Sequence, residues 1–352
     1  MAENEKKTQE IPAMYGNFRV YGKVEKLNKK DFNSMTKTNR EKRSLTLGLR
    51  TSKDNLIFIS MSAVAQDNVY FVKRDSETRK TVDTKIIPWA DRLTNNLPEE
   101  YVPMSSVSVG VVQEEKVNEN GATVLENNTV IRVMFDALQE IYDHVEIGDD
   151  LFIRGNVSVE SYYTNSGEKR NVVRLTPSQI SKRRQLEPLN FDAADFVEQN
   201  VLTQTIIPQS VEFDDDQTRA IINGLVIGNK KEGMIEVEIN KDSIPFAKRI
   251  KSMIEETPCM SIGMNMRIIN EGNVGQQEKI WDEDFQTYIT PPKRAQGSGT
   301  KYLYDSMVQD SVDKVTYTEE NINEFRNTFL RGQQEFGSNN SSQASEDLWG
   351  NI

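Results

Sequence analysis

One order of secondary-structure signals occurs twice along this chain, and it limits the folds that the chain can adopt. In the first half, residues 17–27 read NFRVYGKVEKL and alternate apolar with polar side chains around a central glycine, the period of a strand with one buried face. Similar strand patterns follow at residues 43–50, 55–63, 106–113 and 130–135. Residues 135–145 then carry apolar side chains at helical spacing, and strand patterns return at residues 149–163 and 170–180.

The second half repeats this order with little identity in sequence. Strand patterns occupy residues 218–228 and 233–239, an amphipathic helix is expected at 244–256, and strands follow at 259–269 and, as the last strand, at 285–289. Glycines in the middle of strands predict bulges or sharp bends, which a small curled sheet needs. Five strands with a helix between the third and the fourth describe the OB-fold. We therefore expect a mainly β protein with two OB-like five-stranded barrels.

Breaks in these patterns predict the domain organisation. Charge and a proline interrupt the strand patterns at residues 181–202, and the sequence TPPKRAQGSGTK at residues 290–301 is typical of a linker. A short helix is expected to begin at Thr318, and the small polar residues that follow it predict disorder. The expected parts are a flexible arm at 1–14, an OB-like domain at 15–184, a linker at 185–209, a second OB-like domain at 210–290, a linker with the short helix at 291–337 and a disordered acidic tail at 338–352.

The charge of the chain is unevenly distributed. The 352 residues carry a net charge of −11, yet the segment from Arg19 to Arg92 holds 17 lysines and arginines against 9 aspartates and glutamates, a local balance of +8 that leaves −19 for the rest. A basic segment beside an acidic remainder suggests a polyanion partner for the first domain. There is no apolar run of about 18 residues and no signal peptide, so we expect a cytoplasmic protein without membrane segments.

Residues suited to catalysis or metal binding are scarce. The single cysteine, Cys259, excludes an internal disulfide, and with one histidine, His144, a zinc site of the usual ligands is not expected. No phosphate-binding glycine loop occurs, and no orienting partner for His144 is evident. The acidic clusters at 214–216 and 282–284 are the weak candidates for a magnesium site. We expect no enzyme activity, no cofactor and no metal.

The segment SVESYYTNSGEKRNVVR at residues 158–174 predicts a hairpin with an aromatic and basic tip. Adjacent tyrosines are good strand formers, so the tip is either an ordinary soluble turn or a place for stacked bases. The longer stretch at 151–180 resembles the fourth and fifth strands of single-stranded DNA-binding proteins, in which a glycine-centred strand leads into such a hairpin. The ending SSQASEDLWGNI resembles the tail of the same family, a polar spacer with an acidic and apolar tip.

The resemblance covers residues 16–182 and the last dozen residues, and it has departures. Bacterial housekeeping members carry one OB domain and end on aspartates, proline and phenylalanine, whereas this tail ends on different residues and a second OB-like unit is present. A divergent form, such as a bacteriophage replication protein, would fit these departures. The resemblance implies docking of replication or recombination proteins on the tip, and the expected docking residues are Glu346, Asp347, Leu348, Trp349 and Ile352.

A protein that coats single strands needs cations along the backbone path and aromatic faces for the bases. We expect the nucleic-acid-binding residues to be Arg19, Tyr21, Lys23, Arg50, Lys73, Arg74, Trp89, Phe152, Arg154, Tyr162, Tyr163, Lys169, Arg170 and Arg174. The alternative for Tyr21 and Phe152 is that they fill a gap beneath the insertion, and Trp89 is either a platform or an anchor for its loop. Phe58 and Phe71 are expected in the core.

The sequence therefore predicts a single-stranded DNA-binding protein that coats DNA in replication, recombination or repair and recruits partners through its tail. One alternative is a protein-interaction or inhibitory protein on an OB scaffold, and a weaker one is a strand-annealing recombination protein. Oligomeric state, a preference for DNA over RNA and any contribution of the second domain to binding stay open at this point.

Overall fold

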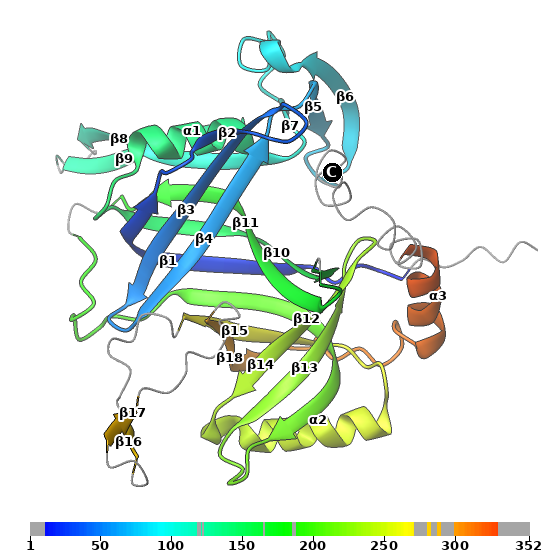
Figure 1. Cartoon of the computed structure of the whole chain (residues 1–352). Coiled ribbons are helices and arrows are strands. Elements are labelled where there is room, and N and C mark those ends of the chain that lie inside the picture. Colours follow the sequence, from blue (N-terminus) through cyan, green and yellow to red (C-terminus); the bar gives the residue numbers. More distant parts are fainter. Residues whose placement is uncertain are drawn as a thin grey trace, which may run out of the picture.

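The protein is built mainly from curved β-sheets, as the computed structural model shows (Figure 1). The structure describes residues 11–117, 121, 123–164, 166–184, 188–270, 280–282, 287–289 and 299–329. These residues form two OB-like units that share one large sheet, so the predicted fold class is confirmed.

The second unit, from β12 to α3, contains a closed barrel of five strands. Its strands are β12 (Asn200–Phe213), β13 (Ala220–Ile227), β14 (Glu232–Ile239), β15 (Ile262–Asn270) and β18 (Thr300–Met307). β12 pairs with both β13 and β15, β13 pairs with β14, and the parallel pair of β14 with β18 completes the circle back to β15. Helix α2 (Ile244–Glu256) follows η2 (Lys241–Ser243) between the third and fourth strands and buries Ile244, Ala247 and Ile250, which recur at helical spacing.

The first unit, from β1 to β11, has the same order of elements but an open barrel. Its elements are β1 (Gly16–Asn28), β2 (Asn33–Met35), β3 (Glu41–Ser52), β4 (Asn55–Val64), β8 (Ser106–Val117), β9 (Thr123–Val133), α1 (Met134–His144), β10 (Asp150–Tyr163) and β11 (Lys169–Lys182). β1 pairs with β3 and β10, and β10 pairs with β11. Among the described strands, β4 pairs with β3 alone, whereas the parallel partner of β11 is β8. In the second unit the third strand, β14, pairs with both β13 and β18. In the first unit the corresponding two pairings are made by different strands, β4 with β3 and β8 with β11.

An insertion separates β4 from β8 and forms a sheet of its own. It contains β5 (Asn68–Arg74), β6 (Thr81–Pro88), η1 (Trp89–Asp91) and β7 (Tyr101–Pro103), paired in the order β6-β5-β7. Arg92 fastens the insertion to α1, because its guanidinium donates two hydrogen bonds to the carboxylate of Asp136, at 2.8 and 2.7 Å. Asp136 is buried, so this ion pair is largely withdrawn from water.

Close contact between strands explains one mid-strand glycine that the sequence singles out. At the bulge of β10 against β11, a Cβ on Gly155 would lie 2.0 Å from the carbonyl oxygen of Thr176. Any larger residue would force the two strands apart, so glycine permits the bend that the sequence predicts at this position.

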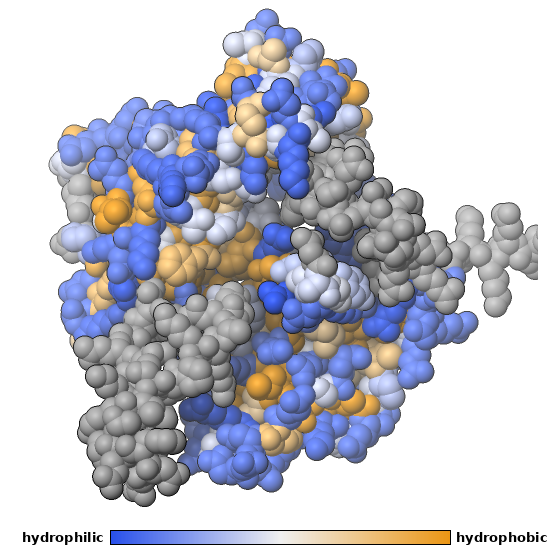
Figure 2. All heavy atoms as spheres, in the orientation of Figure 1, coloured by the Kyte–Doolittle hydropathy of each residue, from blue (hydrophilic) through white to orange (hydrophobic). Residues whose placement is uncertain are grey.

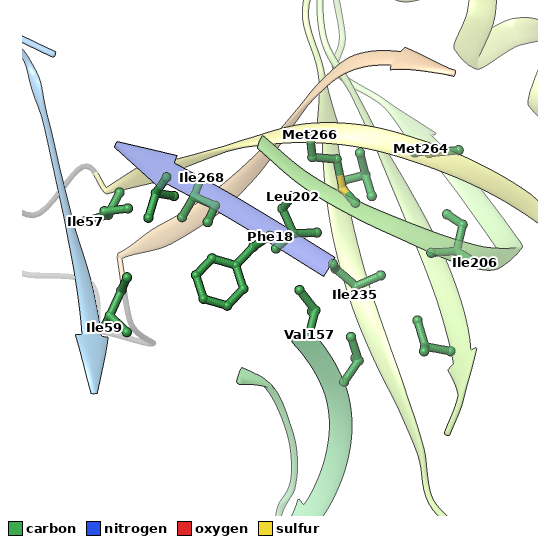
Figure 3. Close-up of a cluster of buried hydrophobic side chains, with 14 of the residues drawn as sticks. Phe18, Ile57, Ile59, Val157, Leu202, Ile206, Ile235, Met264, Met266 and Ile268 are labelled. Carbon is green, nitrogen blue, oxygen red and sulfur yellow. The ribbon is translucent and has the colours of Figure 1, made fainter. Parts of the chain in front are cut away.

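The two units are joined by strand pairing and by a buried polar network. β1 pairs with β12 through Asn17 to Val20, so one sheet runs from the first unit into the second. Its inner side is apolar: Phe18 of β1, Leu202 of β12 and Met266 of β15 pack in one cluster (Figure 3). Next to this cluster the side chain of Asn55 donates to the carbonyl oxygen of Ile268 at 2.8 Å, and that oxygen also accepts from Asn200 at 2.7 Å.

Some predicted elements lie elsewhere. Residues 287–289 form β17 (Thr287–Ile289), which pairs with β16 (Ile280–Asp282) in a separate two-stranded sheet, so the expectation that 285–289 supply the last barrel strand is wrong. β18 takes that place, within the expected second linker, and β12 begins within the expected first linker. The sequence pattern does not predict these two strands, because each lies in a segment rich in polar residues and has polar side chains on its outer side. The expected short helix is confirmed as α3 (Glu319–Phe329), with the Thr318 hydroxyl accepting from the amide of Asn321 at 3.2 Å.

Candidate nucleic-acid interface

The open side of the first unit forms a groove of about 2250 Å³. β4 and the adjoining β2 loop line one wall, β11 lines the other, and β14 and β18 of the second unit lie along its far end. Figure 2 shows apolar surface, in orange, at the centre of this face between hydrophilic blue regions. Pockets for small molecules usually measure about 300–1,000 Å³, so the groove is large enough for an extended polymer.

Phe58 is an exposed aromatic residue on the β4 wall. Its side chain is 41% exposed, and its ring lies across Gly48 on the neighbouring strand β3. A Cβ at position 48 would lie 3.1 Å from the ring and 2.9 Å from the Cβ of Lys26, so glycine leaves the space that the ring occupies. The ammonium group of Lys26 lies 5.6 Å from the ring centroid. The prediction that Phe58 is a core residue is therefore wrong, whereas Phe71 is buried as expected.

The sequence did contain a signal for this orientation of Phe58. In residues 55–63 the buried side chains of Ile57, Ile59 and Met61 alternate with Phe58, Ser60 and Ser62. Two serines on the same side as Phe58 indicate that this side of the strand faces solvent. In the structure the hydroxyl groups of Ser60 and Thr46 form a hydrogen bond of 3.0 Å on this side. Tyr70 of the insertion, which was also not predicted, is 49% exposed and lines the same groove.

Basic residues lie along both walls of the groove. On the wall formed by β2 and β3, Lys37 and Lys42 line the groove and form no ion pair with a described residue. On the opposite wall, Arg170 pairs with Glu168 at 2.9 Å, and Arg174 pairs with Glu160 at 3.8 Å. The lining contains seven basic and five acidic residues. The small excess of positive charge means that ring stacking must supply much of any affinity for a polyanion.

Five of the predicted residues share one face of the paired strands β1 and β10 and do not line the groove. Arg19 lies directly opposite Arg154, and both are exposed. The next outward positions, Tyr21 opposite Phe152, are half-buried. Lys23 donates to the carbonyl oxygen of Leu189 at 3.3 Å. The set is therefore brought together, but on a surface outside the groove.

Tyr21 lies under the segment that connects the two units. Its amide donates to the carbonyl oxygen of Gln199 at 2.9 Å, and the Arg183 guanidinium lies 5.8 Å from its ring centroid. Burial raises the pKa of the Tyr21 phenol, and its hydroxyl group is buried without a hydrogen-bond partner among the described residues. This arrangement is closer to the interpretation that Tyr21 fills a gap than to the interpretation that it stacks on a base. The segment that covers Tyr21 is the connection between the two units, however, and not the insertion.

The hairpin tip of β10 and β11 exposes its two tyrosines. Tyr162 is 46% exposed and Tyr163 is 58% exposed. Lys169 lies 3.8 Å from Glu232 at the start of β14, which also binds Arg326 of α3 at 2.7 Å. Lys169, opposite Tyr163 next to the turn, therefore links the hairpin to the second unit while the tyrosine rings are exposed.

Arg50, Lys73 and Trp89 have structural partners. Arg50 forms a two-bond ion pair with Glu25, and its hydrogen bonds lower the pKa of that carboxyl. Lys73 pairs with Glu100 at 2.7 Å, and Arg74 follows it in the insertion. Trp89 lines the groove, yet its ring packs edge-on against Phe135 at 5.4 Å, and the Arg92 guanidinium lies over it at 4.2 Å. These contacts are those of an anchor, one of the two alternatives for Trp89.

A family model described as YorF matches residues 15–342. The chain belongs to the YorF family. Two solved structures of the single-stranded DNA-binding protein from Thermus aquaticus are similar to it, the wild-type protein with a TM-score of 0.39 and a deletion mutant with a TM-score of 0.37. Each is 10% identical and covers 88% of this chain, with 99% and 98% of its own length matched. No curated protein sequence matches the chain.

The remaining expectations for this YorF-family chain concern metal binding, membrane crossing and the C-terminal tail. Within the described ranges, no group of three or more histidine, cysteine, aspartate or glutamate side chains is arranged to hold a metal ion. No described helix combines the length and apolar character that a membrane crossing requires. The predicted docking residues Glu346, Asp347, Leu348, Trp349 and Ile352 lie outside the described residues.

Proposed function

We propose that this chain binds single-stranded DNA in the groove between β4 and β11 and catalyses no reaction on it. The observation that carries the proposal is the exposed ring of Phe58, which lies against Gly48 beside Lys26 on the groove wall. An exposed ring is unfavourable in water and offers its face to an unpaired base, and each stacked base contributes about 1–3 kcal/mol.

The surroundings of Phe58 fit the rest of a nucleotide chain. Lys37 and Lys42 carry unpaired charge on the same wall and are available to phosphates. Tyr70 provides a second exposed ring on the rim of the groove. A duplex keeps its bases stacked inside and could present only phosphates to these rings. We therefore expect a preference for single strands.

The decisive measurement is fluorescence anisotropy of labelled oligo(dT) and of a duplex of equal length, each titrated with the full chain at several salt concentrations. The proposal predicts tighter binding of the single strand at every salt concentration. It also predicts that Lys37→Gln combined with Lys42→Gln reduces the salt dependence of binding, because two phosphate contacts are lost. A matched control is Lys241→Gln combined with Lys248→Gln, two exposed lysines of the second unit away from the groove. Equal affinity for single strand and duplex would refute the proposal.

We further propose that the bound DNA belongs to replication or recombination, and that the tail at residues 338–352 recruits a protein partner. Support for the tail comes from its sequence, in which Leu348 and Trp349 adjoin acidic residues. Removal of residues 341–352 should leave affinity for oligo(dT) unchanged or raised, while capture of replication proteins disappears. Reduced affinity for oligo(dT) after this truncation would contradict the proposed role of the tail.

A further inference from the structure

The outer side of the sheet that joins the two units carries arginines in a row. Figure 3 shows the inner side of this sheet, where Phe18, Leu202 and Met266 point into the apolar cluster. Because side chains alternate along a strand, the residues that follow Phe18 and Met266, namely Arg19 and Arg267, point to the opposite side. Arg154 is the cross-strand partner of Arg19 and lies on that outer side too. None of these three arginines lines the groove.

The pair of Arg19 and Arg154 is electrostatically unfavourable when the surface is empty. Directly opposite side chains in an antiparallel pair have Cβ atoms about 4.5–5.5 Å apart, and like charges at such positions repel each other. Both guanidinium groups are exposed, and neither forms an ion pair with any described carboxylate. An anion between them would remove the repulsion and accept hydrogen bonds from both planar groups.

The row extends into the second unit and has polar neighbours. Arg267 is 43% exposed and approaches Glu198 only to 4.0 Å. Beside the arginines, Asn156 lies opposite Asn17, which lies opposite Thr203. The hydroxyl of Thr203 donates to the side chain of Asn265 at 2.8 Å, and Asn265 donates to Ser306 at 3.2 Å. A line of amide and hydroxyl groups therefore runs parallel to the arginines across both units.

The length and chemistry of this row define its ligand. From β10 through β1 and β12 to β15 there are three strand spacings, about 14 Å in all, which is more than one phosphate ion can span. The described side chains on the row include no exposed aromatic residue, so it offers contacts to phosphate and sugar but no stacking surface for bases. We infer that the row Arg154, Arg19 and Arg267 is a second binding surface, separate from the groove, for the phosphodiester backbone of single-stranded nucleic acid.

This inference rests on the proposed function and makes a prediction that differs from it. A short oligonucleotide that fills the groove should bind without the row, whereas a longer one should pass from the groove onto the row. Site sizes of about 4–16 nucleotides per OB-fold suggest oligo(dT) of about 8 and about 40 nucleotides as the two probes. The comparison of these lengths separates the row from the groove.

The experiment measures binding of both oligonucleotides to the full chain at several salt concentrations. Arg19→Gln combined with Arg154→Gln is compared with wild type and with the control Lys241→Gln combined with Lys248→Gln. For the long probe, log K falls with log salt concentration, and each lost phosphate contact makes this slope shallower by about 0.7. The slope of the double arginine variant should therefore be shallower than that of wild type by about 1.4. Arg267→Gln should lose about 0.7. The control should match wild type on both probes.

The outcomes distinguish the two ideas. The double arginine variant should have a melting temperature equal to or above that of wild type, because it removes the repulsion between the two arginines. A lower melting temperature would reveal that the variant is misfolded. An unchanged slope on the long probe, or an equal loss on the short probe, overturns the inference while the proposed function stands. If wild type binds neither oligonucleotide, both the proposed function and the inference fail.

Discussion

The two OB-like units use the same order of strands and helix but differ in whether the barrel closes. In the second unit β14 alone pairs with β13 and β18, and the circle is complete. In the first unit those two pairings belong to β4 and β8, with the insertion between them. The gap left by this division becomes the groove. Division of one strand position between two strands therefore accompanies the change from a closed barrel to a barrel with a groove.

Exposure of aromatic side chains follows the same difference. The strongly exposed rings among the described residues belong to the first unit and its flanks, and they are Tyr15, Phe58, Tyr70, Tyr162 and Tyr163. In the second unit Phe246 stacks on Tyr304 with ring centroids 4.3 Å apart, and Tyr317 and Phe325 are buried. The closed unit uses its rings for packing, while the open unit presents them to solvent.

The largest expected effect concerns the ion pair that holds the insertion beside the gap. Arg92→Met leaves the buried carboxylate of Asp136 with only Arg43, at 3.7 Å, as a charged partner. Breaking such a buried pair destabilises a protein by about 3–5 kcal/mol. Urea unfolding monitored by circular dichroism measures the loss. Arg249→Met is the control, because its partner Glu256 is half exposed and the loss should be at most about 1 kcal/mol. Equal losses in the two variants would show that the insertion is not held in this way.

A pair of phenylalanine variants tests whether the two units use their rings differently. Phe58→Ala should weaken binding of oligo(dT) by about 5- to 150-fold, the equivalent of one stacked base at about 1–3 kcal/mol, with little change in stability. Phe246→Ala should lower the free energy of unfolding by about 2 kcal/mol and leave binding unchanged, because its ring packs on Tyr304. Anisotropy and urea unfolding of both variants supply the four measurements. The same pattern in both variants would remove the contrast between the units.

A high-pH measurement tests the closed barrel. Burial raises the pKa of the Tyr302 phenol in β18 well above its ordinary value. A raised pKa in the folded state means that Tyr302 contributes its stability fully below about pH 10 and loses it as the pH rises further. Between about pH 10.5 and 11.5 wild type should lose about 1.4 kcal/mol per pH unit more than Tyr302→Phe. Urea unfolding across this range provides the comparison. Parallel stability curves would mean that water reaches this phenol.

The smallest effect is expected at the exposed ion pair of β1 and β3 in the first unit. The hydrogen bonds from Arg50 lower the pKa of Glu25, so the stability it adds is present above the ordinary carboxyl pKa and is lost as the pH falls through its folded value. Glu25→Gln should cost about 0.2–1 kcal/mol at pH 7, and this difference should vanish in acid. Thermal unfolding at pH 7 and at about pH 3 measures both values. A difference that persists in acid would assign the effect to packing.

Periodicity in the sequence predicted the fold because both units alternate buried and exposed residues regularly. Phe18, Val20 and Val24 are buried as their spacing indicates, and the helices bury residues at the expected intervals. The fifth strand of the second unit was missed, because β18 follows a long polar stretch and has half-buried side chains on both faces. Strand periodicity does not show which strands lie next to each other.

The candidate site was harder to predict because it depends on pairing between distant segments. Arg170 and Arg174 do line the groove, but Phe58 and Tyr70 do so only because β4 does not pair with β11, whose parallel partner is β8. Arg50 and Trp89 are of the residue types expected at a nucleic-acid site. Arg50 nevertheless pairs with Glu25, and the ring of Trp89 packs against Phe135. A sequence shows which side chains can bind a polyanion, whereas the fold decides which of them have no partner.

The amide network at the junction also affects how the protein acquires its structure. The side chain of Asn55 accepts from the amide of Asn270, 215 positions later in the chain, at 3.2 Å. A ribosome must release β15 before this contact can form, so the first barrel leaves the exit tunnel long before its far end has a neighbour. The two barrels are synthesised one after the other, but neither has all its contacts until β15 has been made. A chain truncated before β15 would expose the apolar end of the first barrel that Ile268 covers.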